Sequence, residues 1–299
     1  MTVELIGMTT NIPSSDSGPL ASDQYGSRHV NDAEISLSLQ ELPGTDWQLV
    51  AFDLDDTLAP SKSELPPEMA RALRDLLDVC EVAVISGGAL PQFEAQLLTG
   101  LQAAPKQLQR LHLLPTCGTR YLDFSEGHLV QRYAHDLSEQ QRCDVTTVLE
   151  EVAKEQGIWE EETWGPILED RGSQITYSAL GQEAPLEIKR AWDPSGEKKN
   201  RLAAVAGERL PALEVRSGGS TSVDVTEKGI DKAYGMQKLV EITGIPKDLM
   251  LFIGDRLDPI GNDYPVKASG WPTYAVGGWE DTVVAVDSIV QAKRKDASS

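Results

Sequence analysis

A short acidic motif, Asp53-x-Asp55-x-Thr57, directly follows the apolar run Leu49–Phe52. Such a run is typical of a strand buried on both faces of a parallel sheet, and ligands bind at the carboxyl ends of such strands. Two carboxylates that reach one centre repel each other unless a hard cation such as Mg²⁺ lies between them. A carboxylate beside a metal-bound phosphate can attack phosphorus, while a second acid carries the proton of the leaving oxygen. The pattern therefore indicates phosphoryl transfer with Asp53 as nucleophile and Asp55 as acid and base, although an acidic turn after a buried strand is the plainer alternative.

Three further elements stand at predicted strand ends or helix starts. Ser86 and Gly87 end the apolar segment Glu81–Ile85, where a hydroxyl and backbone amides can hold phosphate oxygens. Lys232 opens a predicted helix and can place a positive charge on the phosphate and the nucleophile. Asp255 follows a third apolar run and is a candidate magnesium ligand together with the acidic motif. Weaker candidates for the metal or its surroundings come next in the chain: Asp258, Asn262 and Asp263.

The elements that must position these residues alternate between strands and helices. This alternation predicts an α/β fold with a Rossmann-like, mostly parallel sheet. Between Ser86 and Lys232 the regular alternation stops, and a long helix over about 137–156 and several short strands are predicted instead. This change indicates an inserted α+β domain. The predicted units are a disordered leader over 1–45, an α/β catalytic core over 46–130 and 228–299, and an α+β cap over 131–227.

The amino-acid composition disfavours some classes of binding partner. The 299 residues carry 47 acidic against 27 basic side chains, and the formal charge of −20 disfavours nucleic acid and anionic membranes. No apolar stretch approaches the length of a membrane span, and the N-terminal residues do not read as a secretory signal. Three scattered cysteines give neither a disulfide framework nor a metal motif. We therefore expect a cytoplasmic protein that acts on a small molecule.

The four elements together resemble the haloacid dehalogenase-like (HAD) superfamily of phosphotransferases. More narrowly, the chain from about Leu49 onward is similar to the branch with an inserted cap, and within it to the eukaryotic-type phosphomannomutases. The resemblance implies that Asp53 is the nucleophile, Asp55 the general acid and base, and Mg²⁺ the cofactor. It also implies metal ligation by Asp53, Asp255 and Asp55, the last through its backbone carbonyl. Thr57, Ser86, Gly87 and Lys232 are then expected around the phosphate and the nucleophile.

Two cap segments extend the resemblance. The stretch 217–225 is similar to the family's Gly-Gly-x-x-Ser-x-Asp-Val strand, which implies that Ser222 and Asp224 contact the substrate. The stretch 164–182 is similar to the segment that carries the mutases' cap arginines, but only Arg171 keeps an arginine. The mutases have arginine where this chain has Trp164 and Gln182, and Lys62 stands where they carry a further arginine.

This departure bears on the expected reaction. A mutase must hold a bisphosphate in two orientations, and neither tryptophan nor glutamine replaces the charge and bidentate geometry of arginine. A hydrolase needs only the phosphate at Asp53. The sequence therefore favours a Mg²⁺-dependent phosphohydrolase acting on a small phosphorylated sugar through an aspartyl phosphate. A phosphomannomutase-type mutase is the alternative, and a non-catalytic binding module on the same fold is a further one.

Overall fold

The computed structural model describes residues 46–298, so the predicted leader over 1–45 lies outside the described residues. The larger of two sheets has seven strands in the order β11-β10-β1-β2-β3-β4-β5. Its strands are β1 (Leu49–Phe52), β2 (Glu81–Ile85), β3 (Leu111–Leu114), β4 (Arg120–Ser125), β5 (His128–Ala134), β10 (Met250–Gly254) and β11 (Thr273–Ala275). The first five strands of that order are parallel, and β4 and β5 join as an antiparallel pair. The predicted α/β fold with a mostly parallel sheet is confirmed.

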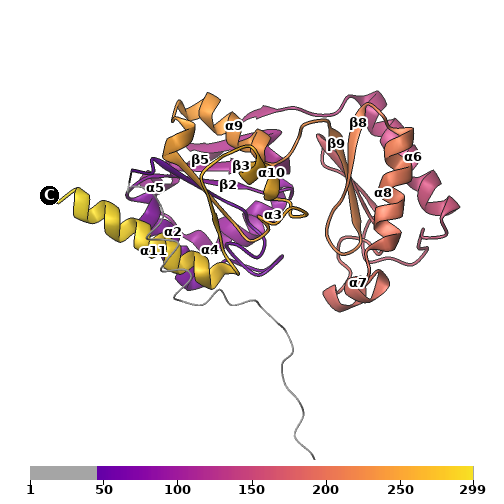
Figure 1. The fold of residues 1–299 in the computed structure, drawn as a ribbon, viewed down its shortest axis with the longest axis horizontal. Helices are drawn as coiled ribbons and strands as arrows, with labels where there is room; N and C mark the ends of the chain where they lie inside the picture. Colours follow the sequence, from indigo (N-terminus) through magenta and orange to yellow (C-terminus); the bar gives the residue numbers. More distant parts are fainter. Residues whose placement is uncertain (1–45, 299) are drawn as a thin grey trace, which may run out of the picture.

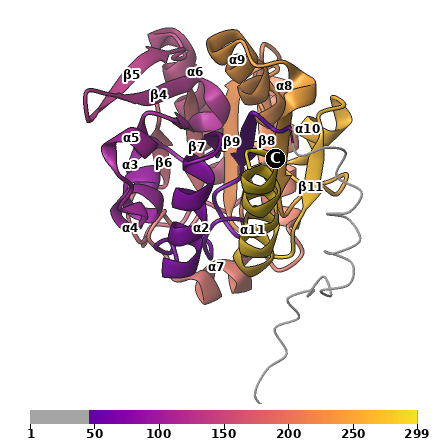
Figure 2. The same ribbon diagram turned by 90° about the vertical axis from the view of Figure 1, so that its left-hand side faces the viewer.

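Helices cover both faces of this sheet, which explains why the central strands are apolar throughout (Figures 1 and 2). On one face, α2 and α11 pack on each other and on side chains such as Val50 and Phe52. On the other face, α9 and α10 cover Leu49 and Ala51. The core helices are α2 (Pro67–Leu77), α3 (Leu90–Phe93), α4 (Thr99–Leu101), α5 (Pro105–Leu108), α9 (Lys232–Thr243), α10 (Tyr264–Ala268) and α11 (Trp279–Asp296). A π-helical turn (Glu94–Leu98) joins α3 to α4, and two 3-10 turns occupy Thr116–Gly118 and Lys247–Leu249.

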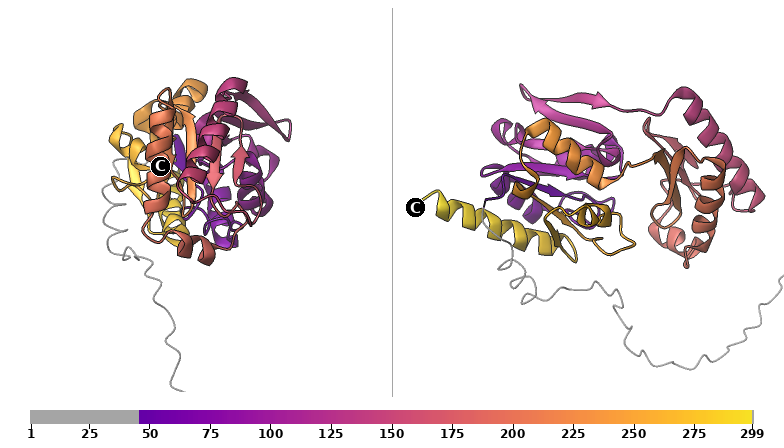
Figure 3. Two further views of the ribbon diagram at one scale, coloured as in Figure 1. Left: turned by 90° about the vertical axis from the view of Figure 1, so that its right-hand side faces the viewer. Right: turned by 45° about the horizontal axis from the view of Figure 1, so that its top comes forward.

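The second sheet forms a separate unit beside the core (Figures 1 and 3). Its order is β6-β7-β9-β8, and all its pairs are antiparallel. Its strands are β6 (Leu168–Asp170), β7 (Gln174–Ser178), β8 (Leu213–Ser217) and β9 (Ser222–Glu227), and its helices are α6 (Glu139–Glu155), α7 (Leu186–Trp192) and α8 (Glu197–Arg209). We call this unit the cap. The cap boundary predicted at residue 131 falls within β5, which is a strand of the core sheet, because sequence analysis did not anticipate the β4–β5 hairpin.

The two faces of the cap sheet have opposite character. Ile175 and Tyr177 of β7 and Val223 and Val225 of β9 pack against α6 and α8. The residues between them are polar and lie on the other face, since successive side chains of a strand point to opposite sides. In Figure 1 the helices lie on the side of the cap away from the core, so the polar face is turned toward the core. Among the described residues, no helix combines the length and apolar character needed to cross a membrane.

Candidate active site

The centre of the site is a buried ion-pair cluster at the carboxyl end of β1. The Lys232 ammonium lies 2.6 Å from Asp53 Oδ1 and 2.5 Å from Asp263 Oδ1. Lys232 is only 1% exposed and Asp53 only 3%. Parallel pairing of β1 with β10 brings the two strand ends together, and Lys232 enters from the first turn of α9. Residues from three distant segments of the chain therefore meet at one point.

Three carboxylates surround this point. Asp53, Asp255 and Asp263 each offer an oxygen, and these oxygens lie within 4.8 Å of one another. One ammonium cannot balance three carboxylates, of which Asp53 and Asp263 are buried and Asp255 is partly buried. Burial raises the pKa of Asp53 to about 8 although Lys232 opposes the shift, and burial together with Asp263 raises the pKa of Asp255 to about 6. A cluster of hard oxygen donors with excess negative charge is suited to a divalent cation such as Mg²⁺.

The loop after β10 is shaped to bring Asp263 back to this cluster. Asp263 Oδ2 accepts a hydrogen bond from the backbone N–H of Arg256 at 3.0 Å. A Cβ at Gly254 would clash with Asp263 Oδ2, so a glycine is needed for the close approach. Sequence analysis ranked Asp263 only as a weaker candidate, whereas the structure places it in the group of three carboxylates. Asp258 and Asn262, the other weaker candidates, are exposed, and Asp258 pairs with Arg256 at 3.0 Å.

The carboxylate of Asp55 does not belong to this group, and its predicted metal ligation through the backbone carbonyl stays a prediction. Gln92 Nε2 and Gln96 Nε2 donate to Asp55 at 2.7 and 3.2 Å, and the backbone N–H of Lys62 donates to it at 2.9 Å. Gln92 and Gln96 lie four residues apart around the π-helical turn, a feature that often occurs at functional sites. Sequence analysis missed both glutamines. They fix the position of the second acid of the motif.

Two predicted phosphate-binding positions have defined partners. Thr57 Oγ1 donates to Asp255 Oδ1 and accepts from the backbone N–H of Asp255, both at 3.1 Å, so this hydroxyl links two loops of the site. Ser86 is buried at the end of β2, and its Oγ accepts the backbone N–H of Gly88 at 3.1 Å. The Thr57 hydroxyl is thus engaged with Asp255, and its predicted contact with phosphate stays a prediction.

The cap contacts the site through Arg171. Arg171 Nη1 donates to the carbonyl of Gly87 at 3.1 Å, while Nη2 pairs with Glu169 at 2.7 Å. Among the buried side-chain nitrogen and oxygen atoms of the described residues, only Nε of Arg171 has no hydrogen-bond partner. A ligand oxygen under the cap could accept from it. The contact places Arg171 beside Gly87, and its predicted role in binding substrate or phosphate stays a prediction.

The polar face of the cap sheet supplies the remaining predicted residues. Asp224 Oδ1 accepts from Thr176 Oγ1 at 2.7 Å and from Gln174 Nε2 at 2.9 Å, and burial raises the pKa of Asp224. Ser222 lies beside it, since an added Cβ at Gly218 would meet both Asp224 Oδ2 at 2.8 Å and Ser222 Oγ at 3.0 Å. This glycine is needed because the turn before β9 passes directly over the two side chains.

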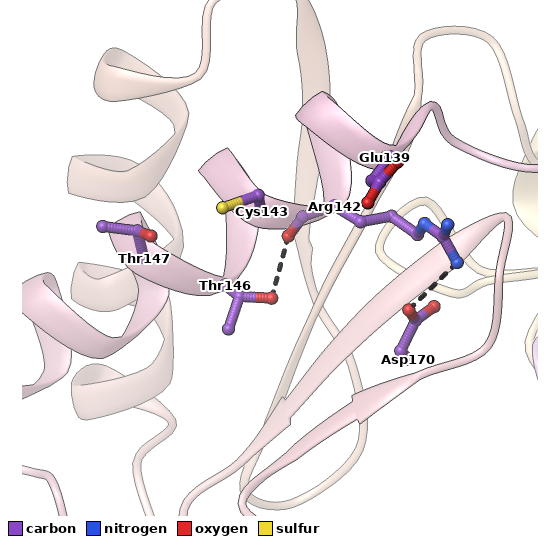
Figure 4. Close-up of a pocket in the computed structure, with 6 residues that line it drawn as sticks. All are labelled: Glu139, Arg142, Cys143, Thr146, Thr147 and Asp170. Carbon is purple, nitrogen blue, oxygen red and sulfur yellow. Dashed lines mark hydrogen bonds and ion pairs between the residues drawn. The ribbon is translucent and has the colours of Figure 1, made fainter.

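A separate hollow of the cap lies between the first half of α6 and Asp170 at the end of β6 (Figure 4). It is formed around Arg142, whose guanidinium pairs with Asp170 at 3.3 Å, and around the exposed Cys143 of α6. No residue predicted for the active site lines it.

Comparisons with known proteins agree with this geometry. Solved structures with the same fold include Plasmodium falciparum IMP-nucleotidase, with a TM-score of 0.65 at 17% identity over 88% of this chain and 72% of that one. A haloacid dehalogenase-like hydrolase from Bacteroides thetaiotaomicron gives a TM-score of 0.56 at 18% identity over 81% of this chain and 99% of that one. The fold is that of these HAD-like proteins, and the match of the phosphomannomutase family model to residues 130–292 makes the chain a phosphotransferase of the HAD type.

The particular family follows from the sequence comparisons. The profile described as "Eukaryotic phosphomannomutase" matches residues 130–292, and the chain belongs to this family. Mouse phosphomannomutase 1 is 25% identical over 234 residues, covering 74% of this chain and 83% of the relative. The phosphomannomutase of Schizosaccharomyces pombe is 26% identical over 239 residues, covering 78% and 89%.

Proposed function

We propose that this enzyme transfers the phosphoryl group of a small phosphorylated sugar through an aspartyl phosphate on Asp53, in a phosphomannomutase-type reaction. The observation that carries the proposal is the contact of Asp53 with Lys232 inside the three-carboxylate cluster. Family membership supports the mutase reaction over the hydrolase that the sequence favoured.

The proposed chemistry uses two carboxyl groups in turn. In the first step an oxygen of Asp53 bonds to phosphorus, the bond from phosphorus to the sugar oxygen breaks, and Asp55 gives its proton to that oxygen. In the second step a sugar hydroxyl bonds to phosphorus, its proton passes to Asp55, and the bond to Asp53 breaks. The first carboxylate and the protonated second acid are thereby restored.

The other residues would support these steps. Lys232 holds the nucleophile and adds positive charge beside the incoming phosphate. Asp53, Asp255 and Asp263 would hold Mg²⁺, which supplies charge that offsets the carboxylates and polarises the phosphoryl group. Gln92 and Gln96 keep Asp55 in place, and the cap excludes bulk water from the aspartyl phosphate.

Hydrolysis is the second candidate because Trp164 and Gln182 occupy positions at which the mutases carry arginine. In that reaction water replaces the sugar hydroxyl in the second step. One assay separates the two: the enzyme is mixed with mannose 1-phosphate, Mg²⁺ and a catalytic amount of hexose bisphosphate. Mannose 6-phosphate without free phosphate supports the mutase, and inorganic phosphate as the main product supports the hydrolase.

The nucleophile is tested in the same assay. Asp53→Asn should abolish both products, since the amide oxygen is a poor nucleophile. Asp258→Asn is the matched control, because it makes the same change at an exposed carboxylate outside the cluster. Equal activity of Asp53→Asn and the unsubstituted enzyme would exclude the proposed covalent step.

A further inference from the structure

A turn of the cap is fastened to the core by three hydroxyl groups. Thr116 and Thr119 lie between β3 and β4 of the core, and Ser173 lies between β6 and β7 of the cap. Thr119 Oγ1 donates to Ser173 Oγ at 2.6 Å, Ser173 Oγ donates to Thr116 Oγ1 at 3.0 Å, and the hydroxyls of Thr116 and Thr119 contact each other. Since a hydroxyl can donate one proton and accept another, the three groups form a closed ring.

The ring is sealed from solvent. Thr116 is 1% exposed, and Thr119 and Ser173 are each 2% exposed. A buried hydroxyl without a partner is costly, and a closed ring in a region of low dielectric satisfies all three. Because one member belongs to the cap, any motion that separates cap and core at this point leaves buried hydroxyls unpaired. Sequence analysis gave none of the three a role.

The two residues before Ser173 are also held from outside the cap sheet. Arg120 Nη2 donates to the carbonyl of Arg171 at 3.2 Å, and the backbone N–H of Leu137 donates to the carbonyl of Gly172 at 3.0 Å. Arg120 belongs to the core strand β4, and Leu137 lies in the segment that joins β5 to α6. The position of Arg171 is therefore set by the core as well as by its own strand.

The core side of the ring also holds residues 86–88, which we call the phosphate loop. The backbone N–H of Thr116 donates to the carbonyl of Gly88 at 3.0 Å, and that of Cys117 donates to the carbonyl of Ser86 at 2.9 Å. Thr116 and Cys117 adopt left-handed φ angles of 48° and 56°, a conformation that residues with a Cβ rarely adopt. Such strain persists where the surrounding structure imposes it, often at functional sites.

Arg171 binds the one carbonyl of the phosphate loop that this turn does not reach. Its Nη1 donates to the carbonyl of Gly87, so every carbonyl oxygen of the phosphate loop accepts from a protein donor. A carbonyl oxygen repels phosphate, and in a planar trans peptide the N–H points the opposite way from the C=O. The unpaired Nε belongs to the same guanidinium and is therefore fixed beside the phosphate loop as well.

We propose that Thr116, Thr119 and Ser173 are positioning residues for phosphate binding. Their hydroxyl ring fixes the cap turn on the core and thereby holds the guanidinium of Arg171 against the phosphate loop. The inference rests on the proposed function, because it concerns the same site. It adds a requirement, since the phosphate loop has its full set of donors only while the cap turn is seated. Phosphate affinity and the seating of the cap turn are then coupled through one arginine.

The ring can be opened at one hydroxyl with little change of shape. Thr119→Val removes the hydroxyl that donates to Ser173, and Thr119→Ser keeps a hydroxyl at that position. Thr146→Val is the matched control, because Thr146 Oγ1 donates to the carbonyl of Arg142 within the cap helix α6. The parent of all variants is the full chain with Asp53→Asn, which prevents turnover. Orthophosphate and mannose 1-phosphate are each titrated in a calorimeter in the presence of Mg²⁺.

Thr119→Val should weaken both ligands about tenfold, as expected when a charge-assisted contact is lost, whereas Thr119→Ser and Thr146→Val should stay within about twofold of the parent. The decisive comparison uses Arg171→Met. If the ring acts through Arg171, adding Thr119→Val to Arg171→Met should cost no further affinity. A loss that persists in the Arg171→Met background, or no loss in Thr119→Val, would overturn the inference.

Protein stability is controlled by a second opening of the ring and by thermal unfolding of every variant. Ser173→Ala opens the ring from the cap side and should weaken both ligands as Thr119→Val does. An affinity that simply follows the melting temperature across the whole set, Thr146→Val included, would overturn the positioning role.

The two ligands separate this inference from the proposed function. The expected pattern with orthophosphate, but no binding of mannose 1-phosphate, would support the ring and refute the sugar substrate. Turnover of mannose 1-phosphate by the unsubstituted enzyme, with unchanged affinities in Thr119→Val, would do the reverse. A parent chain that binds neither ligand would overturn both.

Discussion

The buried cluster around Lys232 gives the sharpest test of the site. Replacing Lys232 by Met keeps a chain of similar length but removes the ammonium that contacts Asp53 and Asp263 at 2.6 and 2.5 Å. Breaking a buried pair by removing one partner costs about 3–5 kcal/mol, because the remaining charge stays buried without compensation. Since Lys232 is 1% exposed, solvent screening does not reduce this figure. We therefore expect the free energy of unfolding to fall by about 3–5 kcal/mol in Lys232→Met at pH 8.

The assay is urea unfolding of the full chain in EDTA, followed by circular dichroism. The loss should depend on pH with a definite sign. Burial already raises the pKa of Asp53 to about 8 and of Asp255 to about 6, so their folded forms bind protons more readily than the unfolded chain does. Protonation at pH 5 removes the repulsion, and the loss should grow as the pH rises toward 8. Mg²⁺ at pH 8 should recover part of the stability.

Lys238→Met is the matched control on the same helix. Lys238 lies toward solvent and pairs with Glu241, so the free energy of unfolding should change by no more than about 0.5 kcal/mol. If Lys232→Met were no less stable than Lys238→Met at pH 8, the claim that Lys232 balances buried carboxylates would be refuted.

Two further outcomes follow from the site. Asp263→Asn should lower kcat and raise the Mg²⁺ concentration needed for half-maximal activity at least about tenfold. Asp258→Asn on the same loop should leave both unchanged, and equal Mg²⁺ dependence in the two variants would contradict a metal role for Asp263. Gln96→Ala removes a donor to Asp55 and should lower kcat about tenfold with little change in KM, a loss of about 1.4 kcal/mol; an altered KM alone would argue against positioning.

Much of the core could be predicted from the sequence because its strands are short, apolar and followed by chemistry-bearing residues. Asp53, Asp255 and Lys232 stand next to a strand end or a helix start, and parallel pairing brings such points together without further information. The hairpin β4–β5 was missed, since its partly buried strands mix polar and apolar residues and contain no apolar run.

Side-chain direction was harder to predict. The carboxylate of Asp55 is held by Gln92 and Gln96, and these partners could not be foreseen because the π-helical turn leaves no periodic signal in the sequence. Asp263 reaches the cluster only because Gly254 lacks a Cβ.

The alternation of side chains along β7 and β9 has a consequence for how this enzyme can change. Tyr177 and Val225 pack against the cap helices, while Thr176 and Asp224, their neighbours in sequence, lie on the face of the sheet that is turned toward the core. The residues expected to decide substrate selectivity and the residues that stabilise the cap therefore lie on opposite faces of the same strands. Substitutions on the polar face can change which substrates bind, while the residues on the apolar face continue to stabilise the cap.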